Sequence, residues 1–273
     1  MTTATKTKDP KTEIVPIATT SVPAFLAAKA HEDAGKGVSN DASDNIVPLI
    51  YLLQSNSPQC NPRGPDHVEN GVSGNIWLRG TGRPAIDGEQ GILVQPCFFN
   101  KVWTEWRLPR GNGLAGVHAD KPADAKEAPS PENPEKTIWL LDNGNQVVET
   151  RNHVVRVFLE DKDGNPTGEV MPFVIAMAGT QHTVSRMWMA LMGAKQIGKD
   201  QAPSWASRYR VTTKSKTKGA NTWNVFDVDD AGWIETQEDY EAGLALHEAF
   251  AKGEKIAEAA EDAAEPQGDN AAM

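Results

Sequence analysis

Short segments rich in β-branched and aromatic residues, separated by turn signals, recur through the middle of this chain and limit what it can fold into. Asn143-Gly144 tolerates the positive φ of a tight hairpin turn, and residues 161–165 (DKDGN) turn the chain again. Pro96 indicates a bulge or an edge position, since proline donates no backbone hydrogen bond. The pattern predicts antiparallel β-hairpins built from residues 91–106, 138–141, 146–148, 152–160, 169–177, 208–213 and 222–228.

Two helices are expected beside these strands. Thr180 can cap a helix that runs to about Gln196, whose apolar face has the i, i+3, i+4, i+7 spacing of Val184, Met187, Trp188 and Leu191. Residues 236–239 (TQED) form a plausible capping box for a second helix that reaches about Phe250 or beyond. Residues 46–53 (IVPLIYLL) fit either a buried strand or a short helix.

The order of these elements predicts a β-rich α+β fold. We expect an OB-like antiparallel barrel with one internal helix, a C-terminal helix and disordered termini. A β-sandwich, or a sheet packed on one helix, would leave a similar pattern of strands and turns in the sequence.

The two ends of the chain are poor in large apolar side chains, so they bury too little surface to offset the cost of ordering the backbone. We therefore expect a disordered N-terminal arm at 1–44, an OB-like nucleic-acid-binding domain at 45–234, a C-terminal helix at 235–256 and an acidic disordered tail at 257–273. Residues 111–135, rich in Gly, Ala, Pro, Lys and Asp, are expected to form a long mobile loop inside the domain. No apolar run is long enough to span a membrane and no signal segment is recognisable, so a cytoplasmic location is expected.

Charge is divided unevenly along the chain. Residues 235–273 hold eleven acidic and two basic side chains, which accounts for nine of the ten net negative charges. By contrast, residues 201–224 contain five Lys and Arg, no acid, and the aromatic residues Trp205, Tyr209 and Trp223. Phosphates attract Lys and Arg, and unpaired bases stack on flat aromatic faces. The combination indicates a protein that binds single-stranded nucleic acid, with an acidic tail that competes for the same groove.

We expect the binding surface to combine two basic and aromatic regions. Each side chain also has a simpler interpretation: a tryptophan is more often part of a core, a basic strand edge prevents aggregation, and loop lysines keep a protein soluble. Alternation along residues 102–106 places Trp103 and Trp106 on opposite faces, so only some of the aromatic residues can reach solvent. The candidate residues are Lys101, Trp103, Trp106, Arg107 and Arg110 from the first region, and Arg208, Tyr209, Arg210, Lys214, Lys216, Lys218 and Trp223 from the last.

Catalytic and cofactor motifs give little support to an enzyme. Pro65-Asp66 with Glu160-Asp161-Lys162 superficially matches a nuclease pattern in which two carboxylates and a lysine hold a metal ion, but a hairpin turn explains the second part more simply. Cys60 and Cys97 have neither disulfide nor zinc spacing and are expected to be ordinary thiols. We therefore expect no catalysis, no cofactor and no metal. A metal-dependent nuclease remains a lesser alternative, and a non-catalytic protein-interaction or virion-associated module is the main one.

The order of four patterned segments resembles that of proteins of tailed bacteriophages and prophages that are described as single-stranded-DNA-binding proteins. These segments are SNDASDNIVPLIYLLQSNSPQ, GEQGILVQPCFFNKVWTEW, FVIAMAGTQHTVSRMWMALM and YRVTTKSKTKGANTWNVFDV, and the similarity spans about residues 40–234. The resemblance implies coating of single-stranded DNA during phage DNA replication or recombination in the host cell cytoplasm. It also implies that the acidic tail docks replication or recombination proteins, although this chain ends in NAAM rather than in an aromatic residue. A homo-oligomer is possible.

Overall fold

The computed structural model describes residues 46–109, 112–131, 133–161, 163–219 and 221–253, together with the backbone of residues 256–257. The chain divides into two units, Met1–Ser39 and Asn40–Met273, and every described residue belongs to the second unit. The expected N-terminal arm and, apart from the backbone of residue 257, the expected acidic tail lie outside the described residues. No helix in the described part of the chain is both long and apolar enough to cross a membrane.

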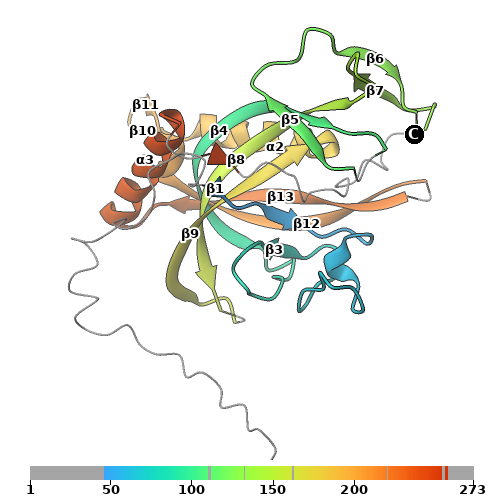
Figure 1. The fold of residues 1–273 in the computed structure, drawn as a ribbon. Helices are drawn as coiled ribbons and strands as arrows, with labels where there is room; N and C mark the ends of the chain where they lie inside the picture. Colours follow the sequence, from blue (N-terminus) through green and yellow to red (C-terminus); the bar gives the residue numbers. More distant parts are fainter. Residues whose placement is uncertain are drawn as a thin grey trace, which may run out of the picture. The chain divides into compact units, whose positions relative to one another are not determined.

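An antiparallel sheet of eight strands forms the centre of the second unit (Figure 1). Its strands follow the order β13-β12-β4-β8-β7-β6, with β5 added to β4 and β9 added to β8. The prediction of a β-rich α+β fold is confirmed, but the predicted barrel does not close among the described residues, because β13 and β6 do not pair. The strands are β4 Ile92–Trp106, β5 Leu114–His118, β6 Lys126–Pro129, β7 Thr137–Leu140, β8 Gln146–Glu160, β9 Pro166–Ala178, β12 Ser207–Lys218 and β13 Asn221–Trp233.

Smaller elements surround this sheet. Three further strand pairs join β1 (Ile46–Val47) to β14 (Ile256–Ala257), β2 (Ile50–Leu52) to β3 (Ile76–Leu78), and β10 (Gln196–Ile197) to β11 (Asp200–Gln201). The two α-helices are α2 (His182–Ala194) and α3 (Gln237–Ala251), and the 3-10 helices are η2 (Pro58–Cys60), η3 (Gly179–Gln181) and η4 (Ser204–Ala206). Residues 46–53 are therefore strands rather than a helix.

The long strands β4 and β8, each of 15 residues, pair along almost their whole length. The register between them shifts at Pro96 and Phe98, which confirms the bulge that the proline indicated. One extra residue reverses the alternation of side chains along a strand. As a result Val94, opposite Val157, and Phe99, opposite His153, lie on the same face of the sheet.

Both faces of the sheet are covered by packed side chains. Val155 belongs to a core that includes Trp188 of α2, whereas its neighbour Val154 belongs to a second core that includes Leu246 and Phe250 of α3. We call these the α2 face and the α3 face. Burial on both sides explains why residues 154–159 of β8 (VVRVFL) are mostly apolar on both faces, which differs from the alternation of a strand with one solvated face.

His153 lies deep in the core on the α2 face. Its ring stacks on Trp188 with centroids 4.5 Å apart, and its Nε2 lies 2.8 Å from the Ser185 hydroxyl. Burial lowers the pKa of His153 to about 3, so the ring is neutral at physiological pH. The ring also lies 4.9 Å from that of Phe99, so His153 packs between two aromatic side chains.

The N-cap predicted for the C-terminal helix is confirmed at Thr236. The Thr236 hydroxyl accepts a hydrogen bond from the Asp239 amide at 3.1 Å and donates one to the Asp239 carboxylate at 2.7 Å. The start of α3 is fixed to the sheet by Arg156, which donates to the Asp239 carbonyl at 2.9 Å, and by Gln95, which donates to the same carbonyl at 3.0 Å. Gly243 leaves room for this network, because a Cβ there would lie 2.5 Å from the Gln95 amide nitrogen.

Three local predictions were wrong. The segment 111–135, predicted to be a loop without regular structure, contains β5 and β6. Thr180 does not cap α2; the residue before the helix is Gln181, whose side chain instead accepts the Phe226 amide at 3.1 Å. The lysine-rich stretch 214–221, which separates the predicted strands 208–213 and 222–228 and was expected to be a loop, instead belongs in part to the strands: residues 214–218 continue β12 and pair with β13 as far as Lys218 and Asn221.

Candidate nucleic-acid interface

The end of the β12–β13 hairpin carries a row of lysines on one side. In an antiparallel pair, residues directly opposite each other share a face. Lys214, Lys216 and Lys218 alternate along β12, and Lys216 lies opposite Trp223 of β13. We call these four residues the hairpin face. Arg210 is an even number of residues from these lysines along β12 and therefore shares their face. It lies opposite Leu93, which is on the α3 face because its neighbour Val94 is on the α2 face. The hairpin face therefore belongs to the α3 face of the sheet.

The lysines of the hairpin face differ in how their charge is neutralised. The Lys214 ammonium lies 2.5 Å from the Asp227 carboxylate. Lys216, which is half-buried beside Trp223, and Lys218, which is exposed, form no ion pair within the described residues. The positive charge available to a phosphate is therefore concentrated at the free end of the hairpin.

The predicted residues at the base of this hairpin have other roles. Tyr209 is completely buried in the core, and burial raises its pKa to about 12. Arg210 forms a two-pronged ion pair with Glu160 at 2.6 and 2.7 Å, and Arg208 pairs with Glu235. The prediction that Tyr209 stacks on bases and that the two arginines track a phosphate backbone is therefore corrected. The sequence placed these acids 50 and 27 residues away, so no local signal showed the pairing.

The predicted residues of the first region differ in burial and in their contacts. Trp106 is buried, and its indole N–H donates to the Thr104 hydroxyl at 3.1 Å, so it is a core residue and not a stacking platform. Lys101 is exposed and Trp103 is half-buried. Arg107 is exposed but donates to the Leu114 carbonyl at 2.6 Å. Arg110 lies outside the described residues.

Two residues that sequence reasoning missed lie beside Trp103. On β8, Glu149 lies opposite Trp103, and Val147 lies opposite Trp139 of β7. Both β8 residues are an even number of positions from Val155 and share its face, so both tryptophans are on the α2 face. The Lys121 ammonium lies 2.8 Å from the centroid of the Trp139 ring and 5.7 Å from that of Trp103. We call Trp103, Lys121 and Trp139 the tryptophan site. Trp139 is a large aromatic residue in a short strand, but no local sequence pattern indicates that Lys121 reaches it.

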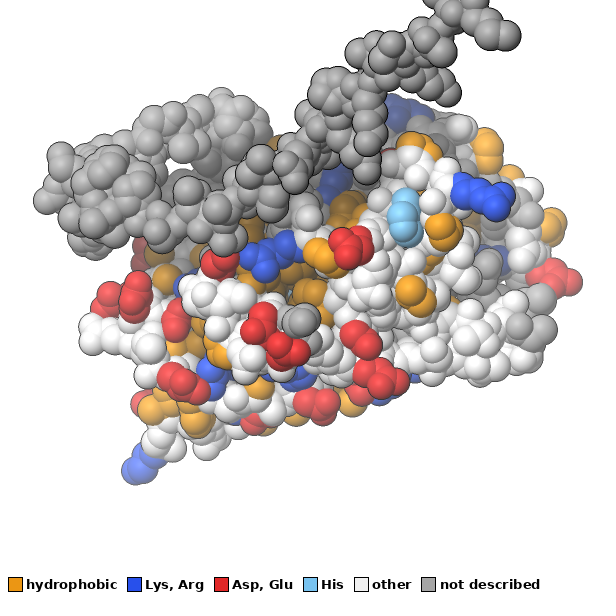
Figure 2. All heavy atoms as spheres, turned by 90° about the horizontal axis from the view of Figure 1, so that it is seen from below, with side chains coloured by type: hydrophobic (Ala, Val, Ile, Leu, Met, Phe, Trp, Pro, Cys, Tyr) orange, Lys and Arg blue, Asp and Glu red, His pale blue; other side chains and the backbone are white. Residues whose placement is uncertain are grey.

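The structure does not bring the two predicted regions onto one surface. By register the hairpin face lies on the α3 face of the sheet, whereas Lys101 and Trp103 lie on the α2 face. Figure 1 shows β5, β6 and β7 as a separate group from the projecting end of β12 and β13. Figure 2 shows a face on which Lys and Arg are interspersed with Asp and Glu, so a broad basic patch is not formed on that side.

The acids of the superficial nuclease pattern are engaged in structural contacts. Glu160 is held by Arg210, and the Asp161 carboxylate accepts the amides of Asp163 and Asn165, both at 2.9 Å, as the hairpin turn requires. Asp66 lies in an exposed turn, and Lys162 is outside the described residues. Within the described ranges, no three His, Cys, Asp or Glu residues are grouped to hold a metal ion.

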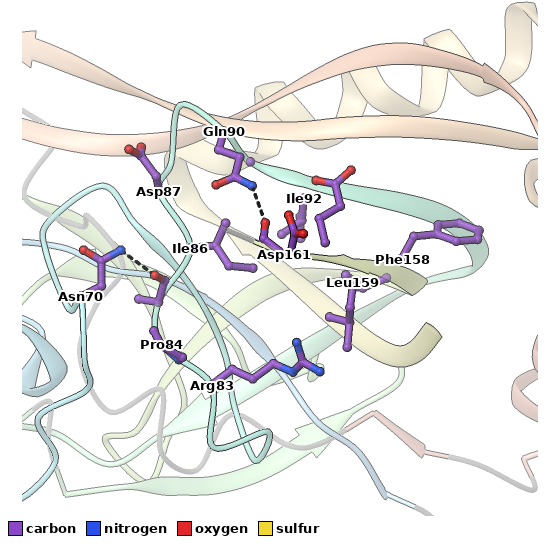
Figure 3. A pocket seen from close by; sticks show the side chains of 14 residues that line it. Asn70, Arg83, Pro84, Ile86, Asp87, Gln90, Ile92, Phe158, Leu159 and Asp161 are labelled. Carbon is purple, nitrogen blue, oxygen red and sulfur yellow. Dashed lines mark hydrogen bonds between the residues drawn. The ribbon is translucent and has the colours of Figure 1, made fainter. Parts of the chain in front are cut away.

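A pocket of about 520 Å³ lies next to Glu160 and Asp161 (Figure 3). Its floor is apolar, with Ile86, Ile92 and Leu159, and Gln90 reaches across to the Asp161 carbonyl at 3.5 Å. Arg83 on its wall is paired with Glu169 at 2.7 Å. The one basic residue of the lining, Arg83, is thus paired outside it, and the other charged residues that line the pocket, Asp87, Glu160 and Asp161, are acidic, which does not favour a site for polyanionic nucleic acid.

Comparison with known proteins places the chain among phage proteins. A family model described as "Pam3 phage gp34-like protein" matches residues 15–256. No curated protein and no solved structure matches the chain.

Proposed function

The chain belongs to the Pam3 phage gp34-like protein family and is a phage protein, and from this premise we propose that it binds single-stranded DNA without sequence preference. Its role would be to coat DNA during phage replication or recombination, without catalysis. The acidic tail would modulate binding or dock replication and recombination proteins of phage or host.

One observation carries this proposal: the hairpin face places two lysines without ion-pair partners among the described residues next to a half-buried tryptophan. Each lysine can neutralise a phosphate, and the indole of Trp223 offers a flat surface that any base can stack on. Stacking contributes roughly 1 to 3 kcal/mol per base whatever the base is. The arrangement therefore favours binding of single-stranded DNA that does not depend on the base sequence.

The same chemistry favours single strands over duplex. A base can stack on Trp223 only when it is not already stacked and paired inside a helix, whereas phosphate contacts are open to both forms of DNA. We expect the lysines to give salt-dependent affinity and the tryptophan to give selectivity for single strands.

The acidic tail, at 257–273, would act as a tethered competitor for the lysines. A segment attached to the same chain is present at high effective concentration, so even weak contacts can compete with DNA. Deleting the tail should tighten binding at low salt.

The experiment that tests the proposal is a titration of the full chain against fluorescent oligo-dT and a duplex of equal length at several salt concentrations. We expect tight binding of oligo-dT, weaker binding of the duplex, and affinity for the single strand that falls as salt rises, with a slope of about −0.7 per phosphate contacted. Absence of binding to oligo-dT at low salt would refute the proposal.

A protein-interaction role is the second candidate, and one observation favours it. The apolar side chains Met187, Met189 and Leu191 of α2 are exposed, Met187 to 61 %. Methionine side chains adapt to the surfaces of different partners. This candidate gains support if the titration finds no salt-dependent DNA affinity at all.

A further inference from the structure

We propose that the tryptophan site is a second base-stacking surface for single-stranded nucleic acid, in which Lys121 covers the Trp139 ring until a base replaces it. This inference rests on the proposed function and adds Trp139 and Lys121, which are separate from the hairpin face.

The first argument is geometric. Trp103 and Trp139 lie on the α2 face, on the two strands that flank β8, and their β8 partners Glu149 and Val147 are two residues apart. Neighbouring strands are about 4.8 Å apart, so the backbones of the two tryptophans are separated by about two strand spacings across the sheet and two residues along it. Their rings are closer than their backbones, because one ammonium lies 2.8 Å from one ring centroid and 5.7 Å from the other. This separation lets one strand of nucleic acid place bases on both rings.

The second argument is the position of the lysine. Lys121 is an exposed residue between β5 and β6, yet its ammonium lies over Trp139 and within 5.7 Å of the Trp103 centroid. An exposed cation–π contact of this kind contributes only about 0.5 to 1 kcal/mol. A base stacked on the same ring contributes roughly 1 to 3 kcal/mol, so it can displace the ammonium. The displaced lysine remains next to the bound strand, where it can contact a phosphate.

The charges around the site favour bases over phosphates. Glu149 is paired with Arg151 at 2.9 Å. The Glu105 carboxylate accepts Asn145 at 2.6 Å and Asn143 at 2.9 Å and contacts His118 at 2.8 Å; the amide hydrogen bond from Asn145 is the main cause that holds its pKa below the usual value. Glu105 therefore stays ionised, and the site carries charges of both signs rather than a concentration of positive charge, which suits an uncharged aromatic ligand better than a phosphate.

Another tryptophan of the chain provides a matched control. Trp233, exposed to 42 %, also has a lysine over its ring, with the Lys195 ammonium 4.7 Å from the centroid. That lysine is held by Asp230 at 2.6 Å, and within the described part of the chain it lies over no second tryptophan ring. Replacing Trp233 therefore removes the same kind of exposed indole from a place where we expect no base.

The experiment compares the full chain with the variants Trp139→Ala, Trp139→Phe and Trp233→Ala. Each is titrated against fluorescent oligo-dT and against an oligomer of equal length whose nucleotides lack bases. We expect Trp139→Ala to weaken binding of oligo-dT roughly 5- to 100-fold, Trp139→Phe to weaken it less, and Trp233→Ala to leave it unchanged. Binding of the abasic oligomer and the salt slope should not change in any of them.

Different outcomes separate the two proposals. If the unmodified chain binds oligo-dT but both Trp139 variants bind it equally well, the stacking site is refuted and the proposed function stands. If Trp139→Ala weakens oligo-dT and abasic oligomer alike, the effect is loss of structure and the stacking site is again refuted, with Trp139→Phe and the thermal midpoint as the check on folding. If the unmodified chain binds no single strand, both proposals fail together.

Discussion

The hairpin face makes a quantitative prediction about salt. In the variant Lys216→Gln/Lys218→Gln, two ammonium groups without ion-pair partners among the described residues are removed from the end of β12. Each phosphate contact on a single strand contributes about 0.7 to the slope of log affinity against log salt. Raising the salt concentration from 50 to 200 mM should therefore weaken binding about 2.6-fold less when one contact is lost, and about 7-fold less when two contacts are lost.

The assay is fluorescence anisotropy of labelled oligo-dT at four or more salt concentrations. The control is Lys126→Gln/Lys199→Gln, which removes two exposed lysines outside the hairpin face: Lys126 of β6, whose ammonium pairs with Asp142 at 2.8 Å, and Lys199 of the turn between β10 and β11. Both double variants change the net charge equally, so a long-range effect of charge would lower both slopes to the same extent. We expect the slope to fall by about 1.4 for the hairpin variant and to change little for the control. Equal slopes for the two variants would refute the placement of the phosphates on the hairpin face.

Three further predictions concern the core, the docking of α3 and the tail. His153 takes up a proton near pH 6.5 in the unfolded chain but only near pH 3 in the folded one. The free energy of unfolding should therefore fall by about 1.4 kcal/mol for each unit by which the pH is lowered from 6.5 to 3, and denaturant titrations should show a flatter profile for His153→Gln. Gly243→Ala should destabilise the fold by about 1 to 3 kcal/mol, since its Cβ would meet Gln95 at 2.5 Å, whereas Gly193→Ala, whose nearest neighbour is 3.9 Å away, should not lower the thermal midpoint. Removing residues 257–273 should tighten binding of oligo-dT at low salt, and unchanged affinity would exclude the tail as a competitor.

The elements of the fold were largely predictable from local patterns. Alternation and turn residues located β4, the β7–β8 hairpin, β9 and the β12–β13 hairpin, and the capping box located α3. These features depend on residues a few positions apart, which the sequence displays directly. The segment 111–135 was misread because its strands are short and poor in β-branched residues, and they are held by pairing with β4 and β7 rather than by their own propensity.

The arrangement of the site could not be predicted, and the bulge in β4 is the main reason. Leu93 lies on the α3 face with Arg210, and unbroken alternation from Leu93 would put Trp103 on that face too. The extra residue at Pro96–Phe98 reverses the alternation, so Trp103 lies on the α2 face. The sequence indicated a bulge, but only the register shows its consequence: the predicted surface divides into two.

Ion pairs between distant residues account for the other differences. Arg208 and Arg210 lie in a stretch without acids, yet Glu235 and Glu160 neutralise them from other parts of the chain. Lys121 follows β5, which pairs with β4, and Trp139 lies on β7, which pairs with β8. The two residues are in contact because β4 and β8 are neighbours in the sheet. Such contacts follow from topology, which local sequence patterns do not determine.

The central claim is that single-stranded DNA contacts the lysines of the hairpin face, and lysine footprinting tests it most directly. The full chain would be acetylated briefly with and without saturating oligo-dT, and the modification of each lysine measured by mass spectrometry. The account predicts that oligo-dT protects Lys216 and Lys218, while Lys126 and Lys199 react equally in both samples. Unchanged reactivity of Lys216 and Lys218 in a sample that binds oligo-dT would contradict it.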